Sequence, residues 1–377
     1  MDIAGGIHLH MGYAGQNGPV VIPLNPSTGQ EDKNGLFNLQ QNTYATSDLN
    51  DALPERRVYV NVHTERHRAG EIRGQLTPPA LRVFRAHLSG TQEIPFATTR
   101  AGGAAIAELQ ADTSVVVSGS FAGLEASVAT DIAGGGHLHN GPAGNNGPVR
   151  FLLNLSLGSN DTSGVIEADS NRYAMNIDDL KNLNRRYFYV NIHSEKYRGG
   201  EIRGQVLPLS QMTFVAPLSS IFEIPRASSF GNGTAVLELM GEQLTLSGSF
   251  SGLTAAVDTT IAGGAHLHMG YTGENGPVIH PLDLILVNEG LAGVFPAETN
   301  TYMLESDQMR AIRNRGMYFN IHTENFPGGE LRGPVAPEAN MLFEASLGGG
   351  NEVPPFASRG FGGALLEIRN GQAVLSG

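Results

Sequence analysis

Residues 187–206 read YFYVNIHSEKYRGGEIRGQV, and this stretch decides the fold class. Its first part, residues 187–195, alternates with a period of two and is rich in Tyr, Phe, Val and Ile, as half-buried strands are. The segments VYVNVHTE (58–65) and MYFNIHTE (317–324) repeat that pattern. Each of the three is followed by a GE(I/L)RG segment that we expect to form a further strand. The recurrence indicates a chain of β-rich repeats.

A second set of motifs fixes the phase of these repeats. The tetrapeptide IAGG begins at residues 3, 132 and 261, and each copy is followed at a constant distance by a G-x-x-G-x-NGPV loop. We therefore expect complete domains at 84–206 and 214–335. Residues 1–78 would be the C-terminal part of an earlier domain, and 343–377 the N-terminal part of a later one. This phase suggests a segment of a longer array.

Local patterns predict few helices. Residues 233–250 (GTAVLELMGEQLTLSGSF) predict two strands joined by a tight Gly-Glu turn. The helical pattern is limited to one short stretch before each histidine strand, at 48–56, 177–186 and 305–315. Turn signals recur every eight to twelve residues or so. The expected fold class is all-β, with tandem Greek-key β-sandwich or barrel domains that each carry one short helix.

Composition narrows the partners and the chemistry. The 377 residues carry a net charge of −12, which argues against nucleic acid. No apolar run approaches the roughly eighteen residues needed to span a membrane. The chain has no cysteine, which excludes disulfides and thiolate metal ligands.

Nine of the twelve histidines form three copies of one pattern: a His-x-His pair and a lone histidine on a later strand. Side chains at i and i+2 of a strand share a face, so each pair can present both imidazoles to one side. Three imidazoles without a thiolate suit copper or zinc and leave a coordination position open. The alternative is that they are polar core residues bonded to backbone. The three triads are His8, His10 and His63; His137, His139 and His193; and His266, His268 and His322.

Charged residues flank each triad. Glu65, Glu195 and Glu324 stand two residues after the third histidine and could supply a fourth ligand or fix an imidazole tautomer. Each GE(I/L)RG segment places a glutamate two residues before an arginine, as in Glu201 and Arg203. We interpret these pairs as cross-strand salt bridges on a sheet surface, with a charge pair near the metal as the alternative.

The repeat resembles the chordin-type (CHRD) domain. The resemblance rests on the opening F-x-A-x-L with E-(I/V)-P, the GSF(A/S)GL strand, HLH-x-G-x-x-G-x-NGPV, and YVN(V/I)H(T/S)E followed by GE(I/L)RGQ. It implies a secreted or cell-surface β-sandwich module, often in tandem. Animal members of the family sit in an antagonist of growth-factor signalling.

A weaker likeness is to copper/zinc superoxide dismutase. In that family too a G-x-(F/I)-x-GL strand leads into an H-x-H pair, and a late V-x-H strand carries another copper ligand. By this analogy His137, His139 and His193 would bind copper. The chain lacks the bridging histidine, the histidine-rich zinc loop and the disulfide of that family, which puts rapid dismutation in doubt.

Three functions follow as hypotheses. The first, which we favour, is a non-enzymatic extracellular repeat protein of a filament, matrix or adhesive, with metal bound in each repeat. In this hypothesis 343–377 of one molecule completes 1–78 of the next, which generates a fibre. The second is a copper-dependent redox protein resembling superoxide dismutase. The third is a binding module for a secreted signalling protein.

Overall fold

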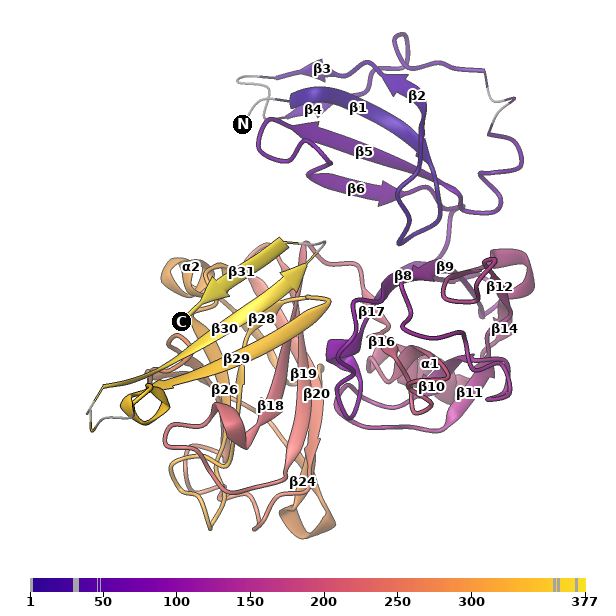
Figure 1. The fold of residues 1–377 in the computed structure, drawn as a ribbon. Helices are drawn as coiled ribbons and strands as arrows, with labels where there is room; N and C mark the ends of the chain where they lie inside the picture. Colours follow the sequence, from indigo (N-terminus) through magenta and orange to yellow (C-terminus); the bar gives the residue numbers. More distant parts are fainter. Residues whose placement is uncertain are drawn as a thin grey trace.

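The computed structural model describes residues 3–29, 34–45, 47, 49–354, 357, 360–369 and 372–377. In this part of the chain the fold is almost entirely antiparallel β-structure, with two short α-helices (Figure 1). We call residues 1–78 the N-segment, 84–206 repeat A, 214–335 repeat B and 343–377 the C-segment. The all-β prediction is confirmed, whereas the division into two complete and two partial domains stays a prediction.

Repeat A is built on one eleven-stranded sheet, in the continuously described stretch 49–354. The strand order is β11-β10-β15-β16-β7-β8-β9-β13-β12, with β14 beside β9 and β17 beside β7. Consecutive strands β7, β8 and β9 form a meander, and β16 returns to lie beside β7. The bounds are β7 Arg82–Ser89, β8 Gly102–Leu109, β9 Ser114–Ala122, β10 Gly136–Asn140, β11 Val149–Leu152, β12 Leu155–Leu157, β13 Gly164–Ile166, β14 Arg172–Ala174, β15 Phe188–Ile192, β16 Ile202–Gln205 and β17 Leu207–Pro208.

The sheet of repeat A curls over so that one face closes on a single core. Alternate residues of each strand point to that face, and apolar residues occupy those positions. The core brings together Phe84 of β7, Val117 of β9, Leu138 of β10 and Val190 of β15, all of them buried. Strands from both ends of the sheet therefore pack against each other as in a sandwich.

Repeat B has the same topology. Its sheet order is β22-β21-β26-β27-β18-β19-β20-β24-β23, with β25 beside β20 and β28 beside β18. The predicted hairpin at 233–250 is confirmed, because Met240 pairs with Gln243 across a turn in which Gly241 has φ +62°. The bounds are β18 Met212–Ser219, β19 Asn232–Met240, β20 Gln243–Ser251, β21 Ala265–Met269, β22 Val278–Pro281, β23 Ile285–Val287, β24 Ala292–Phe295, β25 Thr301–Met303, β26 Met317–Ile321, β27 Leu331–Pro334 and β28 Ala336–Pro337.

Short helices precede the histidine strand in both complete repeats. Helix α1 spans Ile177–Asn184 and helix α2 spans Ser306–Arg313, as predicted. The Asn176 side chain accepts hydrogen bonds from the first turn of α1 and so caps it. The helix predicted at 48–56 is wrong: residues 49–56 form turns, and Asp48 lies outside the described residues. Pro54 lacks an N–H, so the helical bond to the carbonyl four residues earlier cannot form.

The two ends of the chain hold separate parts of the repeat sheet. The N-segment sheet has the order β2-β1-β5-β6, which matches β11-β10-β15-β16 of repeat A. The C-segment sheet has the order β29-β30-β31, which matches β7-β8-β9. The bounds are β1 Ile3–Met11, β2 Val20–Leu24, β3 Ser27–Thr28, β4 Gly35–Leu36, β5 Val58–Thr64, β6 Ile72–Gln75, β29 Met341–Gly348, β30 Phe361–Arg369 and β31 Gln372–Ser376.

Membrane insertion through a helix has no support in the described residues. None of their helices combines the length and the apolar character needed to cross a bilayer.

Candidate metal centre

Two neighbouring strands position each histidine triad. In repeat A, His137 and His139 lie on β10, opposite Asn191 and Tyr189 of β15. His193 directly follows β15 and so falls beside the pair. Leu138, between the two histidines, points the other way and is buried in the apolar core. The period of two in β10 therefore separates a polar face with both imidazoles from the core face.

The three imidazoles converge. In repeat A the ring centroids are 5.4 Å apart for His137 and His139, and 4.9 Å apart for His137 and His193. One nitrogen of each ring lies within 4.8 Å of the corresponding nitrogens of the other two, and the same holds for the other two triads. The centre is also shielded, since His137, His139 and His193 are 1%, 9% and 6% exposed. The structure thus brings together all nine of the histidines selected from the sequence.

Hydrogen bonds to backbone carbonyls fix the tautomer of each ring. His139 Nδ1 lies 2.9 Å from the carbonyl oxygen of Gly147, and His193 Nδ1 lies 3.0 Å from that of Arg198. His137 Nε2 lies 3.2 Å from the carbonyl oxygen of Ala133. A carbonyl only accepts, so each of these nitrogens carries the proton. The remaining nitrogen of each neutral ring is unprotonated and directs its lone pair into the centre.

The converging lone pairs lack a donor. His137 Nδ1 and His193 Nε2 lie 3.1 Å apart although both are acceptors in these tautomers. His139 Nε2 is buried without a partner. Repeat B repeats this arrangement, with three buried ring nitrogens that have no partner: His266 Nδ1, His268 Nε2 and His322 Nε2. A cation between three imidazole nitrogens satisfies every lone pair, and zinc and copper are the ions that prefer such ligands.

Burial prepares the rings for metal binding. Desolvation lowers the pKa of His139 and of His268 to about 4 in each case, with the neighbouring histidines adding to the effect. Desolvation also lowers the pKa of His137, His193 and His322. These imidazoles are therefore neutral at pH 7, which is the form that binds a metal.

A stack of side chains backs the second histidine of each triad. The Tyr189 ring lies parallel to the His139 ring at 4.8 Å, and the Arg203 guanidinium lies 3.5 Å from the centroid of Tyr189 on the same face of the sheet. Arg203 donates to the carbonyls of Pro142 and Asn145, both at 3.0 Å. The stack therefore joins the triad to the loop 141–149. Counterparts are His10, Tyr59 and Arg73, and His268, Tyr318 and Arg332.

The prediction of a surface salt bridge at these arginines is wrong in repeat A. Arg203 is 1% exposed and has no ion pair among the described residues. It stacks on a tyrosine ring and donates to backbone carbonyls and to the Asn146 side chain. Glu201 is buried instead with Thr99, whose hydroxyl donates to it at 2.6 Å. Sequence reasoning missed the tyrosines altogether, although Tyr59, Tyr189 and Tyr318 recur in step with the triads. That recurrence was the available signal.

The glutamates proposed near the metal lie outside the centre. Glu65, Glu195 and Glu324 are exposed, and Glu195 pairs with Arg198 at 2.9 Å. The carbonyl of Arg198, rather than a carboxylate, fixes the tautomer of His193. The unmatched His67 is exposed, in line with its lack of a histidine counterpart.

Comparison with known families agrees with this architecture. The CHRD domain model matches residues 2–76, 84–206 and 214–335, which together make up most of the chain. Among curated proteins no sequence matches. CHRD domains are modules of extracellular type and occur in secreted proteins. With three matches in tandem, the chain belongs to the CHRD domain family.

Proposed function

We propose that this chain is an extracellular structural repeat protein in which each histidine triad binds one copper or zinc ion. One observation carries the proposal: in each triad of repeats A and B, three ring nitrogens without a carbonyl partner face one another while the opposite ring nitrogens of at least two imidazoles are hydrogen-bonded to carbonyls. Polar core histidines would use both nitrogens in hydrogen bonds or expose one to water. Affinity alone favours copper over zinc at such a site.

A bound ion would act as a cross-link. It would join β10 to the residue after β15 in repeat A, and these elements are far apart in the sequence. Binding to the folded state alone stabilises it by about 4 kcal/mol when the free metal exceeds the dissociation constant a thousandfold. This stabilisation fits a module without cysteines, which has no disulfide to serve the same purpose.

Metal titration of the chelator-treated chain tests the proposal. We expect three equivalents of Zn²⁺ or Cu²⁺ per chain, and two equivalents after His139→Ala. His67→Ala is the matched control, because this histidine is exposed and outside the triads. Far-ultraviolet circular dichroism shows whether His139→Ala remains folded. A folded variant that binds as much metal as the wild type contradicts the proposal.

The redox alternative shares the same centre and is tested with the same material. A copper-loaded chain that consumes superoxide, and loses this activity in His139→Ala, would favour the enzyme over the structural protein. We expect no turnover above that of the variant. A binding module for a secreted signalling protein stays a prediction that rests on membership of the CHRD family alone.

We also propose that the 377-residue chain associates end to end. Its support is that the two ends of the chain carry complementary parts of the repeat sheet. In repeat A strand β16 pairs with β7, through Arg203 and Ser89. In repeat B strand β27 pairs with β18, through Arg332 and Ser219. The strands β6 and β29 are the counterparts, in the N-segment and the C-segment. A second copy would supply the missing neighbour of each.

Light scattering after size exclusion tests this association over a range of concentrations. Leu347 of β29 is 54% exposed, whereas its counterpart Leu218 is buried, so Leu347→Lys should block the contact. Phe230→Lys is the control, because Phe230 is 99% exposed in a loop of repeat B and lies on neither β6 nor β29. Monomers at all concentrations would contradict end-to-end association.

A further inference from the structure

We propose that metal in each histidine centre stiffens the junction between that repeat and the next one along the chain. The inference rests on the proposed metal binding and concerns its regulation of the array. Its basis is the loop GPAGNNGPV (141–149), which contacts the histidine centre of repeat A at one side and repeat B at the other.

The tip of this loop docks on the backbone of repeat B. The Ser249 hydroxyl of β20 donates to the carbonyl oxygen of Ala143 at 2.7 Å. Gly144 has φ +84°, and a Cβ there would come within 2.5 Å of the Thr234 nitrogen. Only glycine allows so close an approach. Ala143 is buried in an apolar cluster with Leu207, Val215 and Val236.

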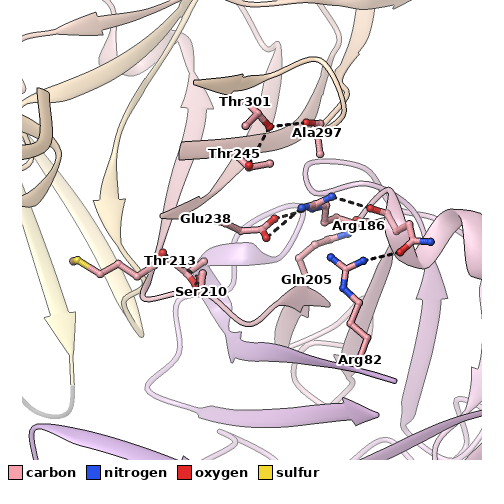
Figure 2. Close-up of polar contacts among 11 residues, drawn as sticks. Arg82, Arg186, Gln205, Ser210, Thr213, Glu238, Thr245, Ala297 and Thr301 are labelled. Atoms are coloured by element: carbon pink, nitrogen blue, oxygen red, sulfur yellow. Dashed lines mark hydrogen bonds and ion pairs between the residues drawn. The ribbon is translucent and has the colours of Figure 1, made fainter. Parts of the chain in front are cut away.

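A partly buried ion pair joins the same two repeats. Figure 2 shows the guanidinium of Arg186 facing the carboxylate of Glu238 on β19. The nitrogen–oxygen distances of this pair are 2.7 and 3.4 Å. Gln205 donates to the carbonyl of Arg186 and, at 2.9 Å, to that of Gly141 at the start of the loop. The ion pair and the loop are thus held by one side chain of repeat A.

The other side of the loop 141–149 contacts the histidine centre of repeat A. His139 donates to the Gly147 carbonyl at 2.9 Å, and the Gly147 N–H donates to the Tyr189 hydroxyl at 3.0 Å. Tyr189 stacks on His139, and Arg203 covers Tyr189 while it donates to two further loop carbonyls. A continuous set of contacts therefore leads from a metal ligand to Ser249 of the next repeat.

The other two junctions are built in the same way. Where the N-segment meets repeat A, the Ser120 hydroxyl donates to the Ala14 carbonyl at 2.7 Å, and Arg56 pairs with Glu108 at 2.9 Å. Where repeat B meets the C-segment, Arg315 pairs with Glu367 at 2.7 Å. In each junction the preceding unit, which carries a histidine centre, supplies the arginine of the ion pair, and the second strand of the next unit supplies the glutamate.

Metal binding would act on this loop through His139. A cation on Nε2 polarises the ring and strengthens the Nδ1–H bond to the Gly147 carbonyl. The bound cation also fixes the His139 ring. The loop 141–149 is then already ordered, so it loses less conformational freedom on docking to repeat B than it would without metal. Coupling between sites is reciprocal, so a weakened junction must lower metal affinity in repeat A.

The test uses a chain with one centre, in which His10→Ala and His268→Ala leave only the triad of repeat A. Hydrogen exchange is followed in β19 (Asn232–Met240), which belongs to repeat B and holds no metal ligand. We expect Zn²⁺ to slow exchange in β19. In the same chain, Glu238→Gln should weaken zinc binding at repeat A about fivefold. Glu242→Gln is the control, because Glu242 is an exposed residue at the β19–β20 turn.

The outcomes separate this inference from the proposed function. One equivalent of zinc bound, with unchanged exchange in β19 and unchanged affinity in Glu238→Gln, overturns the coupling and leaves metal binding intact. Absence of zinc binding in the folded single-centre chain overturns both. Slower exchange together with weaker binding in Glu238→Gln, but not in Glu242→Gln, supports the coupling.

Discussion

The N-segment and repeat A hold the same triad in different surroundings. In repeat A the strands β7, β8 and β9 extend the sheet beyond β16, and Ile202 of β16 is fully buried. In the N-segment β6 is the outer strand, and its Ile72 is 65% exposed. His137 is 1% exposed, whereas its counterpart His8 is only half-buried. The arrangement of the three histidines therefore depends on the two histidine strands and their loops. The burial of these histidines depends on the rest of the sheet.

Two hydrogen bonds of the triad are shared by the two regions. His10 and His63 keep their carbonyl partners in the N-segment, at Gly18 and Arg68, both at 2.9 Å. These two rings are oriented as their counterparts His139 and His193 are in repeat A, so the two centres differ chiefly in burial. The comparison makes four predictions.

The largest expected effect is on stability. Ile202→Ala removes a fully buried side chain and should lower the free energy of unfolding of repeat A by about 2–5 kcal/mol. Ile72→Ala, at the same position of the N-segment, should change stability by less than about 0.5 kcal/mol. Urea unfolding followed by hydrogen exchange of each part measures both. Equal effects at the two positions would show that the N-segment has a covered core in solution.

The second prediction concerns pH. Burial raises the pKa of Glu93 from 4.5 to about 8, so the folded repeat binds more protons than the unfolded chain between these values. The stability of repeat A should therefore decrease, through this group, as the pH rises from 4.5 to 8. Glu93→Gln should remove a slope of at most about 1.4 kcal/mol per pH unit.

The difference between Glu93→Gln and the wild type isolates this carboxyl from the histidines. Glu352→Gln is the control, because Glu352 is the exposed counterpart in the C-segment. Stability of repeat A is measured by urea unfolding at each pH. A difference that does not change with pH would contradict the buried, protonated state of Glu93.

Metal affinity should differ between the same two regions. We expect the N-segment centre to bind zinc about tenfold more weakly than that of repeat A, because His8 is only half-buried and its ring is less firmly held than that of the buried His137. Competition with a chromophoric chelator measures this in chains with one centre each: His139→Ala with His268→Ala, and His10→Ala with His268→Ala. Equal affinities would mean that burial of the first histidine has no effect on binding.

The smallest expected effect belongs to the exposed glutamates. Glu195→Ala should change zinc affinity at repeat A less than twofold or so, because its carboxylate pairs with Arg198 in solvent. The same titration measures it. A loss of tenfold or more would restore Glu195 as a partner of the metal site.

Much of the fold and the triads could be predicted because the deciding interactions are local. The period of two in residues 187–195 places alternate residues on opposite faces, and the Gly241-Glu242 turn specifies its hairpin. The failure at 48–56 is local as well, since Pro54 interrupts the helical hydrogen bonds.

The surroundings of the site could not be predicted, because they depend on contacts between distant segments. Arg203 looks like a surface residue until the loop 141–149 folds over its face of the sheet. The junction joins Arg186 to Glu238 of another repeat, and nothing in either local sequence indicates the contact. Only the recurrence of both residues in each repeat gave a hint.

X-ray absorption spectroscopy of the zinc- or copper-loaded chain tests the central claim most directly. The account predicts three imidazole nitrogens around each ion, at about 2.0–2.1 Å for zinc. It also predicts three ions per chain, one for each triad among the described residues. A loaded chain whose ions are surrounded by oxygen ligands without imidazole would contradict the account.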